Sequence, residues 1–144
     1  RVPARTVATA RLLEPLQLRK LLLKNRVIRA AAYAGSGLES MLKCHQEVAE
    51  GGAAMTTIAY CSVSDDGRTF ASQLVLDERS LSPEQVGGLQ RMTAAVHAAG
   101  AAVSVQLTHG GGFSTAAVIG QKQSAPSATF SPANFSPSLF LCGV

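Results

Sequence analysis

The amino-acid sequence predicts an α/β fold built on a parallel β-sheet. Apolar runs of strand length alternate with two stretches of helical periodicity, glycines end both helical stretches, and polar residues follow the last apolar run. An order of strand, helix, strand, helix, strand is typical of a parallel sheet with right-handed crossovers. Hydrophobic residues make up 47% of the chain and charged residues only 15%, which favours a buried scaffold over a disordered segment.

The first elements are short and extended. Residues 16–18 and 21–23 are leucine-rich, flank two basic residues, and predict a hairpin or two extended pieces. Residues 27–32 (VIRAAA) predict the first strand of the parallel sheet, ending near Tyr33.

A helix and a second strand follow. Apolar residues recur at helical spacing from Leu38 to Ala49, and a glycine pair at 51–52 predicts the stop. Cys44 and His45 are neighbours on this helix, so they point in different directions and are interpreted as two unrelated side chains. Residues 53–60 (AAMTTIAY) predict the second strand, and the Asp-Gly pair at 66–67 marks a turn in the next loop.

The second helix has the clearest boundaries. Ser82 is a favourable N-cap, Pro83 fits the first turn, and Gln85 completes a capping box. Gly100 supplies the stop. The predicted apolar stripe consists of Val86, Leu89, Met92, Thr93 and Val96.

Residues 101–107 predict a buried third strand, and the polar residues at its end predict a binding site. In parallel α/β folds, ligands lie at the carboxyl ends of strands. Gln106 offers an acceptor and two donors to a heterocycle edge, and His109 offers a donor or a proton. The glycines at 110–112 predict a flexible turn that lets the backbone approach a ligand. The Ser-, Pro- and Ala-rich sequence after Gly112 predicts a long loop or a poorly ordered tail.

Two architectures fit this element order: a doubly wound sandwich, or part of a (β/α)8 barrel. The sandwich calls for GxGxxG at the first strand-to-helix turn, where the sequence has AYAGSG. No acidic residue follows the next strand as a ribose ligand, so the match to a dinucleotide-binding fingerprint is weak. No GxxxxGK[ST] phosphate loop is present.

Composition excludes several function classes. The net charge is +4, but the basic residues are scattered and aromatics make up only 5%, which argues against nucleic-acid binding. No apolar stretch approaches the ~20 residues needed to span a bilayer. Three cysteines without CxxC spacing favour reduced thiols in a cytoplasmic protein, without disulfides or a metal site. The basic residues at 1–11 are equally typical of an organelle targeting remnant and of a disordered terminus.

Six short segments together resemble the old yellow enzyme family of NADH:flavin oxidoreductases. They occur in order between Leu12 and Ser127, at the spacing of that family. The resemblance implies a (β/α)8 TIM barrel with FMN at the carboxyl ends of its strands, of which residues 12–127 form about the first three βα units. Residues 1–11 are then a disordered or targeting-like N-terminus and 128–144 a divergent loop or tail. The segments are LLEPL (12–16), LKNRVI (23–28), AEGGA (49–53), VSDDGR (63–68), AVHAAG (95–100) and QLTH (106–109).

The resemblance also implies roles for individual residues. Gln106 matches the glutamine that hydrogen-bonds the pyrimidine edge of the flavin. His109 lies near the flavin and substrate in some branches and is the candidate catalytic residue; the alternative is an imidazole that stabilises the loop. Gly112 stands where the family often has arginine, and Ala31 where most members have proline. The remaining expected flavin contacts, at the ends of the first and second strands, are Ala31, Ala32, Tyr33, Ala59 and Tyr60.

The implied reaction transfers hydride from NADH or NADPH to FMN, and then to the β-carbon of a small α,β-unsaturated substrate. The family's carbonyl-binding pair, proton donor and phosphate-binding loops lie beyond Val144. Two interpretations follow: the N-terminal part of an ene-reductase-like enzyme, or an inactive truncated product or half-barrel completed by self-association or a partner chain. Whether this chain is itself an enzyme stays open. A third interpretation is an unrelated nucleotide- or phosphate-binding α/β domain.

Overall fold

The computed structural model describes residues 11–33, 37–114, 116–120 and 123–127. The chain divides into two compact units: the first holds Arg1–Ile58 and Gly87–Val105, the second Ala59–Val86 and Gln106–Val144. The predicted terminal segments fall outside the described residues, except for Arg11, so they stay predictions.

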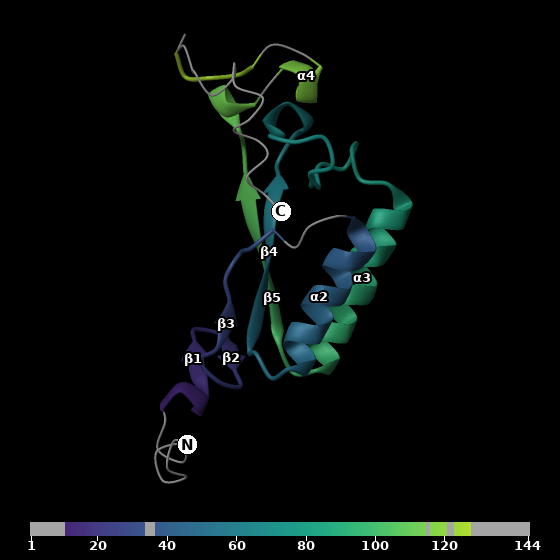
Figure 1. The fold of residues 1–144 in the computed structure, drawn as a ribbon. Coiled ribbons are helices and arrows are strands. Elements are labelled where there is room, and N and C mark those ends of the chain that lie inside the picture. The colour runs from purple at the N-terminus through teal and green to yellow at the C-terminus, as the bar shows by residue number, and fades with distance from the viewer. Residues whose placement is uncertain (1–10, 34–36, 115, 121–122, 128–144) are drawn as a thin grey trace, which may run out of the picture. The chain divides into compact units, whose positions relative to one another are not determined.

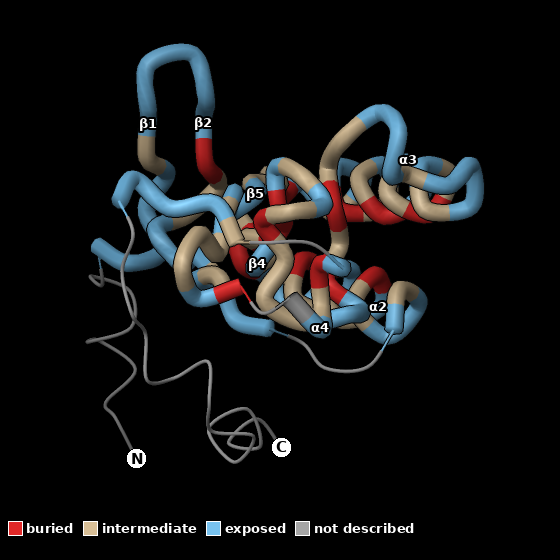
Figure 2. Tube along the Cα trace, turned by 90° about the horizontal axis from the view of Figure 1, so that it is seen from above, coloured by how far each residue is buried: buried red, intermediate tan, exposed pale blue. Residues whose placement is uncertain are grey.

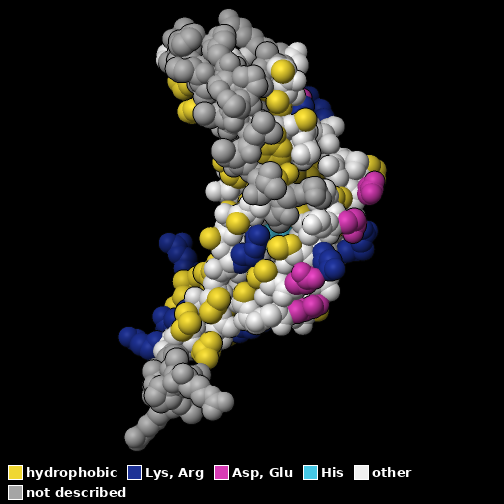
Figure 3. Space-filling view, in the orientation of Figure 1, with side chains coloured by type: hydrophobic (Ala, Val, Ile, Leu, Met, Phe, Trp, Pro, Cys, Tyr) yellow, Lys and Arg dark blue, Asp and Glu magenta, His cyan; other side chains and the backbone are white. Residues whose placement is uncertain are grey.

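The leucine-rich segments form the predicted hairpin. After a short 3-10 helix, η1 (Arg11–Leu13), strand β1 (Leu16–Leu18) pairs antiparallel with β2 (Leu21–Leu23). Leu23 is buried, whereas the other leucines of β2 and Leu18 are exposed. Figure 3 shows hydrophobic side chains gathered over this part of the first unit.

Three strands form the predicted parallel sheet, in the order β3 (Ile28–Arg29), β4 (Met55–Ser62) and β5 (Ala102–Thr108). Ile28 pairs with Met55 in a parallel register. The Ala102 amide donates to the Ala54 carbonyl, and the Val63 amide donates to the Thr108 carbonyl. The two strands therefore meet start to start and end to end, and β5 runs parallel to β4 (Figure 1).

Two strand predictions were wrong in detail. Only Ile28–Arg29 forms a strand instead of residues 27–32, and beyond the strand the Ala32 carbonyl accepts a hydrogen bond from the Arg29 guanidinium (3.2 Å). The third strand is not buried: Val105 is 40% and Leu107 60% exposed. Among the described strands β5 lies at the edge of the sheet, so it has a strand neighbour on one side only.

Two helices cover the sheet side by side, α2 (Leu38–Glu50) and α3 (Pro83–Ala98) (Figure 1). A Cβ at Gly88 of α3 would lie 2.9 Å from Leu42 Cδ1, so glycine allows this close approach. Met92 and Val96 of the predicted stripe are buried, whereas Val86 is exposed. Figure 2 shows buried positions on the sides of these helices that face each other and the strands.

Both helix boundaries follow their local signals. The Gly51 amide donates to the Glu47 carbonyl at the end of α2. At the start of α3, the Ser82 amide donates to Gln85 Oε1 (2.8 Å) and the Gln85 amide donates to Ser82 Oγ (3.1 Å). This reciprocal pair is the predicted capping box.

Replacing Ser82 by alanine should lower the free energy of unfolding by about 1 kcal/mol, because the Gln85 amide loses its acceptor. Urea denaturation measures the change. Ser80→Ala is the matched control, since the exposed hydrogen bond from Ser80 Oγ to Asp77 is long (3.4 Å) and its loss should change the free energy of unfolding little. Equal effects of the two variants would contradict the capping role.

The segment after the third strand is more ordered than predicted. The glycine run forms a 3-10 helix, η3 (Gly111–Phe113), and a short helix, α4 (Ala116–Ile119), follows. Gly111 has a φ of 53°, which glycine adopts without strain. The turn predicted at 66–67 is the 3-10 helix η2 (Asp65–Gly67). No helix in the described part of the chain is long and apolar enough to cross a membrane.

Candidate functional site

A cavity of about 290 Å³ lies in the second unit, where β4 and β5 end. Side chains from both strand ends meet there with the loops that follow them. Three sequence-predicted residues, Tyr60, Gln106 and His109, are thereby brought together. The full lining is Tyr60, Thr69, Gln106, Thr108, His109, Gly110 and Phe113.

The Gln106 amide is held from one side. The Tyr60 backbone amide donates to Gln106 Oε1 at 3.2 Å, across 46 residues of sequence. This bond occupies the oxygen and turns the Nε2 donors away; Nε2 has no hydrogen-bond partner in the described part of the chain. The site therefore presents an amide donor at the cavity wall.

Tyr60 carries unusual backbone geometry. Its φ is 56°, in the left-handed region that a bulky residue enters only at a cost on the order of 1–3 kcal/mol. The Tyr60 carbonyl accepts a hydrogen bond from Gln73 Nε2 at 2.9 Å, and its ring lies 6.4 Å from that of Phe70. Contacts to the amide, the carbonyl and the ring together hold this conformation.

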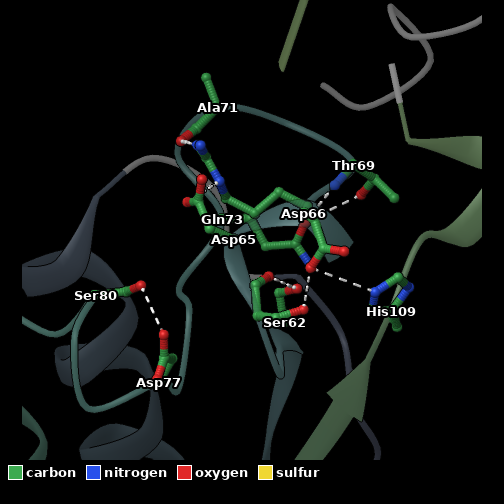
Figure 4. A network of polar contacts seen from close by, with 11 residues as sticks. Ser62, Asp65, Asp66, Thr69, Ala71, Gln73, Asp77, Ser80 and His109 are labelled. Carbon is green, nitrogen blue, oxygen red and sulfur yellow. Dashed lines mark hydrogen bonds and ion pairs between the residues drawn. The ribbon is translucent and has the colours of Figure 1, made fainter. Parts of the chain in front are cut away.

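His109 lines the cavity, but one of its ring nitrogens is hydrogen-bonded within the chain and the other lies near a carboxylate. Nδ1 accepts a hydrogen bond from the Gly111 amide at 3.0 Å, so the neutral ring carries its proton on Nε2. Nε2 lies 3.6 Å from Asp66 Oδ1, and Figure 4 shows the two side chains turned toward each other. This geometry favours the loop-stabilising interpretation of His109.

Asp66 is the charged centre of this network. A hydrogen bond from Ser64 Oγ, helped by the nearby imidazole of His109 and by Ser124, lowers the pKa of the Asp66 carboxyl. Asp66 is therefore an anion at neutral pH and acts as an acceptor for the loop. Arg68 serves the same loop, since it donates to the Ala71 carbonyl and pairs with Asp65 at 2.9 Å.

The remaining lining suits a flat conjugated ligand. Tyr60 and Phe113 contribute exposed aromatic rings, and Thr69 and Thr108 contribute hydroxyls. Cys61 follows Tyr60, but burial raises the pKa of its thiol to about 11. The thiol stays protonated at neutral pH and is a poor nucleophile.

The other predicted flavin contacts lie elsewhere in the chain. Ala31, Ala32 and Tyr33 follow β3 in the first unit, and the Ala32 carbonyl accepts from Arg29. Ala59 is half-buried on β4 and is not part of the cavity lining. Gln73 was missed, because nothing in its sequence context marks a glutamine that is only 5% exposed.

A family model described as the NADH:flavin oxidoreductase / NADH oxidase family matches residues 11–138. A 4,4'-dithiodibutanoate disulfide reductase of Rhodococcus erythropolis is 42% identical over 132 residues, covering 88% of this chain and 32% of that protein. A probable N-methylproline demethylase of Rhizobium meliloti is 39% identical over 104 residues, covering 68% of this chain and 15% of that protein.

Solved structures agree with these sequence matches. Morphinone reductase superposes with a TM-score of 0.68 at 29% identity, over 82% of this chain and 32% of that one. The old yellow enzyme of Trypanosoma cruzi superposes with a TM-score of 0.70 at 24% identity, over 89% of this chain and 39% of that one. At this identity the likeness shows the fold alone. The predicted barrel-family fold is thereby confirmed, and this chain spans about a third of the length of such enzymes.

Proposed function

Because the chain belongs to the NADH:flavin oxidoreductase / NADH oxidase family, we propose that it supplies the pyrimidine-binding wall of the flavin site in an FMN-dependent oxidoreductase that uses NADH or NADPH. One observation carries the proposal: the Gln106 amide is fixed at the cavity by Tyr60, with its donors turned away from the fixing bond. A flavin presents carbonyl oxygens along its pyrimidine edge, which are the acceptors that such a donor binds.

The residues of the cavity fit the flavin ring. Tyr60 and Phe113 offer apolar surface to a planar ring, and Gln106 offers a donor to its polar edge. When bound, FMN supplies the hydride chemistry between the nicotinamide and the second substrate. Residues of the chain bind and orient the ring.

Each residue has a proposed task. Gln106 donates to a pyrimidine carbonyl and stabilises negative charge on that edge. Ala31, Ala32, Tyr33 and Ala59 are proposed to contact the flavin, as the family resemblance implies. His109 is kept as the candidate for a substrate-side contact, although its Nδ1 already accepts the Gly111 amide.

The proposed second substrate is a small molecule with an activated alkene. A relative is named as a disulfide reductase, so the substrate class also includes disulfides as a second candidate. The raised pKa of Cys61 argues against a thiolate relay through this cysteine in either reaction. We further propose that self-association or a partner chain completes the site around this chain, which a mass measurement of the FMN-bound species tests.

Titration of FMN with the purified chain, followed by quenching of flavin fluorescence, tests the proposal. We expect saturable quenching, and Gln106→Ala should weaken binding up to about tenfold, the cost of one hydrogen bond. Gln46→Ala is the matched control, because Gln46 is exposed on α2 and its amide donates to Glu50, away from the cavity lining. Absent quenching would overturn FMN binding by this chain, and unchanged affinity of Gln106→Ala would overturn the role of Gln106.

A further inference from the structure

We propose that Gln73 is a positioning residue that sets the direction of the Gln106 amide, acting through the backbone of Tyr60. This inference rests on the proposed role of Gln106 in binding a flavin. Gln73 does not line the cavity and is only 5% exposed, so it acts through the residues that it holds.

The Gln73 side chain is fully engaged. Its Nε2 donates to the Tyr60 carbonyl (2.9 Å) and to Thr108 Oγ1 (3.1 Å). Its Oε1 accepts from the Thr69 backbone amide (2.7 Å) and from Thr69 Oγ1 (3.2 Å). A backbone amide only donates and a carbonyl only accepts, so these partners fix the Gln73 amide in one orientation.

Gln73 and Gln106 hold the two sides of the same residue. Gln73 binds the Tyr60 carbonyl, and Gln106 accepts from the Tyr60 amide. Between these two bonds lies the φ of 56°, which a tyrosine leaves readily when its restraints are removed. Relaxation of φ turns the Tyr60 amide away from Gln106 Oε1, and the Gln106 side chain is then free to rotate.

The orientation of Gln106 decides which ligand edge the cavity binds. With Oε1 held by Tyr60, the amide presents donors and selects a carbonyl-bearing edge. A rotated amide presents its oxygen instead, which repels a carbonyl. Gln73 thereby determines specificity for an acceptor edge without touching the ligand.

A double-mutant cycle on FMN affinity tests this coupling. Gln73→Ala should weaken binding about fivefold in the parent but less than twofold in a Gln106→Ala background. Gln73→Glu keeps the size and the acceptors for Thr69 but replaces the donors, so it should weaken binding at least as much as Gln73→Ala. Equal weakening by Gln73→Ala in both backgrounds would show a general structural effect and overturn the proposal.

Two spectroscopic readouts separate positioning from loss of fold. In FMN labelled with ¹³C at both pyrimidine carbonyls, Gln73→Ala and Gln106→Ala should move the bound resonances in the same direction. In the ligand-free chain, Gln73→Ala or Gln73→Glu should speed hydrogen exchange of the Tyr60 amide at least tenfold, with exchange in α2 and α3 unchanged. Unchanged Tyr60 exchange overturns this inference alone, whereas absent FMN binding by the parent overturns the proposed function.

Discussion

Replacing Gly110 by alanine should lower the free energy of unfolding by about 3 kcal/mol, the upper end of the usual cost of overpacking. Gly110 has ordinary helical angles (φ −67°, ψ −27°), so the penalty is steric. Its new Cβ would overlap Ser114 Oγ, and would lie 2.7 Å from Thr69 Cγ2 and 3.1 Å from the Gly67 carbonyl oxygen. That carbonyl also accepts the Gly110 amide at 2.7 Å, so the two backbones cannot separate without losing the bond.

Two variants serve as controls for Gly110→Ala in urea denaturation. Gly87→Ala, on α3, where the nearest atom to a new Cβ is Arg91 Nη1 at an ordinary contact distance of 3.5 Å, should raise the free energy of unfolding by about 0.5–1 kcal/mol through helix propensity. Ser114→Ala should restore part of the loss, because it removes the overlapping Oγ, which is buried without a hydrogen-bond partner in the described part of the chain. If Gly110→Ala left the free energy of unfolding nearly unchanged, the loop could rearrange to accommodate a Cβ, and the close approach at Gly110 would not constrain the sequence.

Stability should fall as the pH is lowered from 6.5 toward 4, because His45 is buried in its neutral form. His45 is 1% exposed on α2, and its Nδ1 lies 2.7 Å from Oγ1 of the buried Thr56 on β4. Burial, and then the charge of Arg29, lower the pKa of His45 to about 4. The unfolded chain takes up the proton near pH 6.5, so it binds more protons across this window, and protonation costs at most about 3 kcal/mol of stability.

Denaturation of the chain and of His45→Gln between pH 7.5 and 4 measures this dependence. The parent should lose stability across the window, whereas the difference between the two proteins should shrink as the pH falls. His97→Gln, at an exposed position of α3, should keep the slope of the parent. A parent slope retained in His45→Gln would assign the acid sensitivity to other groups.

The elements that depend on local signals could be predicted from the sequence. Ser82 and Gln85 mark the start of α3 by their own hydrogen bonds, and Gly52, with a φ of 98° that favours glycine, follows the end of α2. The length of β3 and the exposure of β5 could not be predicted, because they depend on how the strands pair and on their order in the sheet. An apolar run indicates that burial of the strand is favourable, but it does not indicate which neighbouring element covers the strand.

Some residues of the candidate site could likewise be predicted from the sequence, and others could not. Tyr60, Gln106 and His109 end predicted strands, so the rule for parallel sheets pointed to them. The contacts of Gln73 and Thr69 arise in a loop without periodicity, where a glutamine usually lies in solvent. The use of FMN and of a nicotinamide nucleotide could be predicted only from the family resemblance, because no motif in the sequence indicates either of them.

The hydrogen bonds around the cavity also have a consequence for the order of folding. They join residues far apart in sequence: 35 positions for Gln73 and Thr108, 46 for Tyr60 and Gln106, and 58 for Asp66 and Ser124. The capping box of α3 spans three positions and forms from neighbouring residues alone. Because closing a long loop costs entropy before its contacts form, the helices can be populated while the cavity is still open. We therefore expect the cavity to form late in folding and to be lost early in unfolding.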